Sequence, residues 1–366
     1  MIEKPRFSYI DIGAGIMILW MIVGHAVYAA SSVEISLYDL CSRIGEEFPA
    51  DKVHAIVGKN GQLHPIGLSK LIPNCLFFFM PWFFYKSGQF FRKRGLIDAW
   101  RDDWKKLINK FILWSAFGYI LYLIFQYIDG FLTLRTATYD VLYGLFFFGS
   151  VRLNSPLWFL LSLFIVRQIA NMQLPDNEDR YYSLKNVIII VACCLVAFCA
   201  YSLHWRYLPY TVANCALGLA FFTLGYWIHR YETKWWLFVP CLLVYIACCI
   251  FGFPEIDVRS NYCVNSKMYL LSLPACFAGI IVFNMFTRIL SSRLRFISTP
   301  LESIGRSAMI IYVSHGLIFE SVCRVLPSMG ITCLMTFNSA LWIVLCAYVL
   351  LLPIFCILSR KLVGAN

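Results

Sequence analysis

The chain has 366 residues, of which 60% are hydrophobic and 14% charged, whereas soluble domains average roughly 45–50% apolar and about 25% charged residues. This composition excludes an ordinary soluble globular protein and indicates an integral membrane protein. The net charge of +11 does not indicate nucleic-acid binding, because the basic residues stand in short segments between apolar runs rather than in one stripe.

Apolar runs recur from end to end, which predicts one membrane domain over residues 1–366. A hydrocarbon core of about 30 Å requires about 20 helical residues, so we expect an all-α, polytopic fold of about ten transmembrane helices. The predicted spans are Ile10–Ala29, Leu71–Phe91, Phe111–Ile128, Leu157–Ile169, Asn186–Leu203, Val212–His229, Trp236–Phe251, Tyr269–Thr287, Ser307–Val325 and Ala340–Leu358. The shorter run Val141–Phe148 suits a re-entrant or interfacial element better than a further span.

The distribution of Lys and Arg predicts that the N- and C-termini are both cytoplasmic, since inner loops carry most of the positive charge. One inner segment, "FRKRGLIDAWRDDWKKLINK", alternates bases with Trp100 and Trp104 and predicts an interfacial helix. Its bases either set the topology or bind an anionic cytosolic donor. The longest outer segment, Ser31–Lys70, either contacts an acceptor or is a solvated connection.

The fifteen cysteines lie mostly inside apolar runs, and the sequence has no Cys-x-x-Cys pair. We interpret them as small buried hydrophobic residues. The sequence therefore predicts no metal site and no permanently bound cofactor.

Titratable groups within apolar runs are functional candidates, because each costs several kcal/mol in lipid unless it is paired or faces water. They are Asp11 and His25 in the first run, Lys86 in the second, and His315 and Glu320 in the ninth. Asp11 could also be an interfacial N-cap. His25, about 21 Å further along the helix, could be a hydrogen-bonded residue at the outer end. An imidazole can act as a general base toward a hydroxyl, whereas Glu320 lies about 140° around the helix from His315 and is not expected to pair with it.

Four segments together resemble the membrane-bound acyltransferase family 3. They are "YIDIGAGIMILWMIVGH", "LFFFMPWFFYKSGQFFRKR", "SPLWFLLSLFIVR" and "IGRSAMIIYVSHGLIF", in the order that the family has them. The resemblance implies an enzyme that moves an acyl group, commonly acetyl, from cytosolic acyl-coenzyme A to a hydroxyl of an extracytoplasmic or lipid-linked glycan. It also implies a bacterial inner membrane as the location.

The resemblance implies roles for individual residues. The family's first-span Asp and His fall on Asp11 and His25, and its late His falls on His315, which makes these three the expected catalytic residues. Its Ser-Gly pair falls on Ser87 and Gly88, followed by a basic cluster. The expected donor-binding residues are Lys86, Ser87, Arg92 and Arg94.

The chain departs from the family pattern at Ala14, where the family usually has Lys or Arg. A cation there would stabilise negative charge on the donor, often the largest contribution to catalysis. Lys86 is at a similar depth from the inner surface, so we hypothesise that it supplies this cation. The alternative is that Lys86 extends to the inner interface and has no contact with the donor.

Two other functions are consistent with the composition. A transporter or flippase of lipid-linked sugars would be expected to have internal repeats or matched broken helices, and the sequence has no such repeat. A catalytically impaired family member acting as a binding module is favoured by Ala14. In each case we expect membrane lipids and a glycan or lipid-linked sugar as partners, and no nucleic acid.

Overall fold

A computed structural model describes residues 8–44, 53–57, 61–175, 184–203, 209–254, 256–263, 268–328 and 337–363. These residues are almost entirely helical, with two short two-stranded sheets, which confirms the all-α fold class. They form two compact units. Unit 1 comprises residues 1–17 and 75–306, and unit 2 comprises residues 18–74 and 307–366. Helix α1 (Ser8–Ile44) contributes to both.

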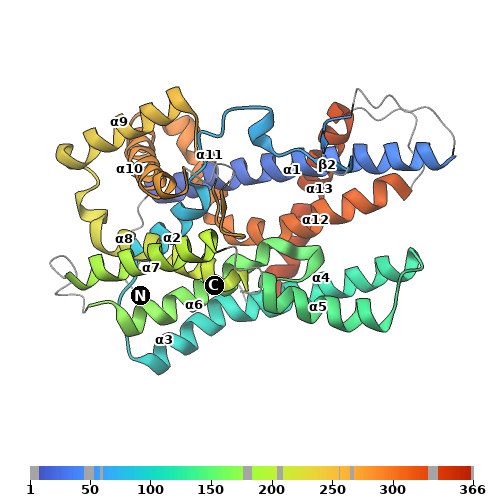
Figure 1. Ribbon diagram of the computed structural model, residues 1–366, viewed down its shortest axis with the longest axis horizontal. Coiled ribbons are helices and arrows are strands. Elements are labelled where there is room, and N and C mark those ends of the chain that lie inside the picture. Colours follow the sequence, from blue (N-terminus) through green and yellow to red (C-terminus); the bar gives the residue numbers. More distant parts are fainter. Residues whose placement is uncertain are drawn as a thin grey trace. The chain divides into compact units, whose positions relative to one another are not determined.

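Unit 1 contains most of the helices (Figure 1). They are α2 (Phe79–Gln89), α3 (Leu96–Asp103), the π-helical turn η3 (Trp104–Ile108), α4 (Asn109–Ile128), η4 (Arg135–Tyr139), α5 (Asp140–Tyr143), η5 (Gly144–Phe148), η6 (Arg152–Leu157), α6 (Trp158–Gln173), α7 (Leu184–Ser202), α8 (Tyr210–Ile228), η7 (His229–Tyr231), α9 (Trp235–Phe251), α10 (Tyr269–Arg293) and α11 (Arg295–Arg306). Strands β3 (Ile256–Asp257) and β4 (Tyr262–Cys263) pair antiparallel between α9 and α10.

Unit 2 contains α12 (Ala308–Ser328) and α13 (Phe337–Val363) together with the larger part of α1. An antiparallel hairpin follows α1, formed by β1 (Ala55–Val57) and β2 (Leu63–Pro65), and then the 3₁₀ turn η2 (Leu68–Lys70).

Eight segments in the described ranges are long and apolar enough to cross a membrane, which confirms a multi-pass protein. They are Ser8–Arg43, Leu96–Ile128, Arg135–Gln173, Leu184–Ser202, Tyr210–Tyr231, Tyr269–Arg293, Ala308–Leu326 and Phe337–Ile354. The predicted spans Leu71–Phe91 and Trp236–Phe251 correspond to the shorter helices α2 and α9. Helices suit lipid because all their backbone polar groups are bonded internally.

Helix α1 is longer than the predicted span Ile10–Ala29. Its 37 residues correspond to about 55 Å, which exceeds a hydrocarbon core of about 30 Å. No Pro or Gly stands between Ala26 and Ile44 to end the helix. The predicted outer connection therefore begins as helix, while its residues 45–52 and 58–60 lie outside the described ranges.

The basic segment that is predicted to form an interfacial helix is helical and continues into the following helix. Helix α3, the turn η3 and α4 follow one another without a break from Leu96 to Ile128. The physical reason is the absence of Pro and Gly from Leu96 to Phe117. The run Val141–Phe148 lies in α5 and η5, which end at Gly149, where a φ of 66° requires a residue without a Cβ atom.

Glycines allow α2 and α8 to pack with their backbones in contact. A Cβ atom on Gly88 would overlap the carbonyl oxygen of Phe222, and one on Gly225 would overlap the carbonyl oxygen of Tyr85. Small residues at such positions let membrane helices approach closely, which maximises van der Waals contact where lipid supplies no hydrophobic driving force. Helices α1 and α11 also pack closely at a glycine, where Gly15 faces the carbonyl of Leu301.

A buried carboxylate links four elements of unit 1. Glu232, only 2% exposed, accepts hydrogen bonds from Tyr85 Oη at 2.7 Å, Arg288 Nη2 at 3.0 Å and Asn284 Nδ2 at 3.1 Å. Arg288 Nη2 also donates to Tyr9 Oη at 2.6 Å. Burial raises the pKa of the Glu232 carboxyl, while its three donors oppose that shift. The network therefore connects α1, α2 and α10 to the residue that follows η7.

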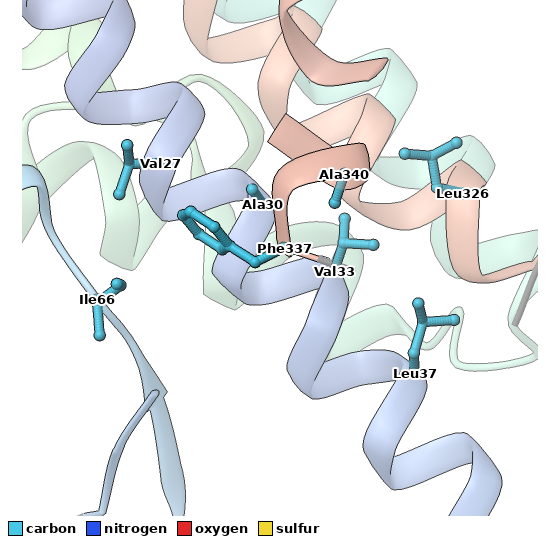
Figure 2. Close-up of a cluster of buried hydrophobic side chains, with 8 residues drawn as sticks. All are labelled: Val27, Ala30, Val33, Leu37, Ile66, Leu326, Phe337 and Ala340. Carbon is cyan, nitrogen blue, oxygen red and sulfur yellow. The ribbon is translucent and has the colours of Figure 1, made fainter. Parts of the chain in front are cut away.

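Unit 2 has its own apolar core, formed by α1, α12, α13 and the chain after β2 (Figure 2). Its members on α1 recur at helical spacing and face the first turn of α13. The core consists of Val27, Ala30, Val33, Leu37, Ile66, Leu326, Phe337 and Ala340. It fixes the C-terminal part of α1 within unit 2.

We predict that Gly88→Ala destabilises the protein, because the new methyl group must separate α2 from α8. Overpacking typically costs about 1–3 kcal/mol, so the thermal unfolding temperature in detergent should fall. Gly95→Ala is the matched control, since its added Cβ atom would meet only the Asp98 carboxylate, at 3.5 Å. Equal unfolding temperatures for Gly88→Ala and wild type would contradict the close packing.

Candidate active site

His315 is completely buried in α12, and its ring is held by its own helix. Its Nδ1 atom lies 2.6 Å from the carbonyl oxygen of Tyr312. A carbonyl oxygen can only accept, so we assign the hydrogen to Nδ1, which leaves a lone pair on Nε2 of the neutral ring. Within the described residues this Nε2 atom has no hydrogen-bond partner. His315 therefore presents an unused proton acceptor inside a membrane helix.

His25 of α1 lies directly beside His315. Their ring centroids are 4.9 Å apart and their planes are tilted by 53°. Phe319 packs against both imidazoles, with centroid distances of 6.5 Å to His25 and 6.2 Å to His315. His25 is the more exposed of the two. The structure thus brings together two histidines that are 290 positions apart in the sequence, and all these contacts lie within unit 2.

Such a pair is suited to moving protons. A partly exposed imidazole can take a proton from a hydroxyl, and a buried second imidazole with a free lone pair can stabilise or accept that charge. Among the described residues, no three His, Cys, Asp or Glu side chains are grouped to hold a metal ion.

Asp11 lies in unit 1 and contacts α11. Its Oδ2 atom is 4.0 Å from Nε of Arg306, which also pairs with Glu302. Glu302 in turn accepts a hydrogen bond from the Ser8 hydroxyl at 2.8 Å. The interpretation of Asp11 as an N-cap is wrong, because α1 already includes the three residues before it.

Lys86 lies over the indole of Trp82, with Nζ 5.3 Å from the ring centroid. The same indole faces Gly13, where a Cβ atom would be 2.9 Å from Cζ2 of Trp82. Lys86 therefore belongs to the part of α2 that packs against α1 next to Ala14, which is fully buried.

The other predicted donor-binding residues have different surroundings. Ser87 is half-buried at the end of α2, and Arg92 is exposed just beyond it. Arg94 is engaged inside unit 1, where Nη1 lies 2.5 Å from Asp102 and Nη2 3.6 Å from Asp103. Arg92 is thus the more accessible of the two arginines. Gly88 has the packing role described above.

A surface groove of about 490 Å³ follows α3 and η3. It is lined by Ile97, Trp100, Arg101, Trp104 and Lys105. The two indoles are stacked with centroids 5.8 Å apart. Exposed tryptophans next to bases are typical of a segment at the membrane–water interface.

The fold and these side chains define a multi-pass membrane protein with an imidazole pair between its helices. Comparison with known protein families matches an acyltransferase domain, that of acyltransferase family 3, to residues 7–360. The match covers nearly the whole chain, so the protein belongs to this family of membrane acyltransferases. No curated protein and no solved structure shows significant similarity to the chain.

Some contributors to the site were not predicted. Arg306, the partner of Asp11, directly follows Gly305 in the "IGRSA" segment, and its place in that family-like segment was an available signal. The role of the Tyr312 carbonyl had no sequence signal, because every residue has a carbonyl group. Phe319 is one of 31 phenylalanines, and only its contacts distinguish it.

We predict that His315→Gln and His315→Ala both reduce acyl transfer by at least about 100-fold, the lower end of acid–base contributions. Gln retains a hydrogen-bonding side chain but cannot take up a proton, so a protonation role requires loss in both variants. Transfer rates are measured at matched protein levels. If the Gln variant matches wild type, His315 only orients its neighbours.

Proposed function

We propose that the protein transfers an acetyl group from cytosolic acetyl-coenzyme A to a hydroxyl of an extracytoplasmic or lipid-linked glycan. The imidazole pair of His25 and His315 is the observation that carries this proposal. In an acyltransferase, a pair of neighbouring histidines within apolar helices supplies the base that a poorly nucleophilic hydroxyl requires.

In the proposed reaction, the acceptor oxygen forms a bond to the acyl carbon while the carbon–sulfur bond of the thioester breaks. His25 takes the hydroxyl proton and passes it to the free Nε2 lone pair of the adjacent His315. The proton then passes to the departing thiolate of coenzyme A. Charge and atoms balance without a further reactant.

The donor is proposed to bind through the cations of unit 1. Lys86 and Ser87 at the end of α2 and the exposed Arg92 beyond it would contact the phosphates or the thioester. Lys86 compensates for Ala14, because its ammonium group lies over Trp82, which packs against the residue next to Ala14. Arg94 would need to leave Asp102 to take part.

The proposed topology has both termini in the cytoplasm of a bacterial cell and the protein in its inner membrane. In this orientation the basic cluster after α2 is at the inner surface and His25 is near the outer end of the span.

Incubating the purified protein with labelled acetyl-coenzyme A and following the label distinguishes the proposal from its alternatives. Transfer of the label to glycan, or hydrolysis of the thioester, supports the enzyme. Binding without either reaction supports a binding module. Absence of any interaction supports a transporter or flippase of lipid-linked sugars.

We predict that His25→Ala lowers acetyl transfer by about 100- to 10,000-fold, the range of general-base contributions. Thermal stability should remain close to that of wild type, because His25 is only partly buried. His64→Ala, which removes an exposed imidazole on β2, is the matched control and should keep full activity. A His25→Ala protein with more than half the wild-type rate would rule out the base.

We predict that Lys86→Leu raises the KM for acetyl-coenzyme A by about tenfold to 100-fold, because it removes a cation proposed to contact the donor. Each factor of ten corresponds to about 1.4 kcal/mol of lost binding free energy. Lys70→Leu, at an exposed position in η2, is the matched control. An unchanged KM in Lys86→Leu would show that Lys86 extends to the membrane interface and does not contact the donor.

A further inference from the structure

Beyond the imidazole pair, α1 carries a second carboxylate–histidine contact in unit 2. Glu34 lies nine residues beyond His25 on α1 and is buried. His54 directly precedes β1. Their side-chain exposures are 4% and 47%. Glu34 Oε2 accepts the backbone N–H of His54 at 2.8 Å and lies 3.4 Å from its Nδ1 atom.

Two neighbours contact the imidazole of His54, and a third, Ser31, holds its main chain. Glu34 faces Nδ1, and the ring of Phe337 stacks on the imidazole with centroids 4.5 Å apart and planes at 29°. The hydroxyl of Ser31 donates to the His54 carbonyl oxygen and accepts the N–H of Ile66 at 3.2 Å. These contacts fix the main chain on both sides of the hairpin against α1.

The fixed ring leaves its second nitrogen available. A carboxylate at Nδ1 favours the tautomer with hydrogen on Nδ1 and a lone pair on Nε2, as in enzymes that use a carboxylate to orient a histidine. The His54 side chain is 47% exposed, and its contacts among the described residues involve the backbone, Nδ1 and the face of the ring. The backbone N–H alone anchors the loop, and any aromatic ring could stack on Phe337, so the fold does not account for an imidazole with an exposed edge at this position.

We propose that His54 is a binding residue in an outer acceptor subsite, where Nε2 accepts a hydrogen bond from a sugar hydroxyl. Glu34 is the positioning residue that sets the tautomer and angle of the ring. This inference rests on the proposed glycan acceptor. One part of that acceptor would bind at His54.

The position of the subsite defines the kind of acceptor. Glu34 follows His25 by nine residues on α1, which corresponds to about 13.5 Å along the axis. Nine residues also rotate the helix by about two and a half turns, so the two side chains point to different sides of α1. A single sugar cannot reach both, and the acceptor is therefore an extended glycan, bound at His54 away from the reacting hydroxyl.

The test uses the full-length protein in lipid nanodiscs with labelled acetyl-coenzyme A and two acceptors. One acceptor is the envelope polysaccharide isolated from producing cells that lack this protein, and the other is the same polysaccharide hydrolysed to single sugars. His54→Ala should raise the KM for the polysaccharide by about threefold to tenfold, the scale of one hydrogen bond. Transfer to single sugars and hydrolysis of acetyl-coenzyme A without acceptor should not change.

Glu34→Gln keeps an acceptor for Nδ1 and should have a smaller effect than His54→Ala. His64→Ala removes an exposed histidine from the same hairpin and should have no effect. Ser31→Ala loosens the same loop without removing the imidazole. If Ser31→Ala reproduced the effect of His54→Ala, anchoring of the loop would explain the change in KM and the subsite would be rejected.

An unchanged polysaccharide KM in His54→Ala, with an active wild type, would overturn the subsite and leave the proposed function intact. A wild-type protein that neither transfers nor hydrolyses acetyl would overturn the proposed function, and the subsite with it.

Discussion

Lipid cannot solvate a polar group, so a polar side chain buried among membrane helices needs a partner within the protein. Glu232 meets this need with three donors, and those donors connect helices that are far apart in the sequence. His315 meets it only in part, because Tyr312 satisfies one ring nitrogen and leaves the other without a partner in the described residues. The satisfied group stabilises the fold, whereas His315 is the candidate for chemistry because its free nitrogen belongs to a titratable ring within a membrane helix.

Helix α1 carries three of the groups that matter most. Asp11 contacts α11 in unit 1, while His25 and Glu34 belong to unit 2. An uninterrupted helix holds its side chains at fixed spacing and rotation. The positions of these groups along α1 are therefore set by helix geometry. A Pro in its interior would displace them and would destabilise the helix by at least about 3 kcal/mol.

The departure at Ala14 becomes easier to understand in the packed structure. Ala14 is fully buried, and its neighbours Gly13 and Gly15 face Trp82 and Leu301 at close distance. A long cationic side chain would have to leave this crowded region to reach water. A lysine on α2, near its end, needs no such path, which supports the proposal that Lys86 supplies the cation for the donor.

The sequence by itself determined the class of protein, because apolar runs of membrane length require helices whatever their partners. It also selected His25 and His315 as candidates, since histidine is rare in apolar runs and both fell in family-like segments. It did not determine that α1 continues to Ile44, that Arg306 partners Asp11, or that His54 is oriented by Glu34. Those features depend on contacts between residues distant in the chain, and helical periodicity specifies only which residues share a face, not which face they meet.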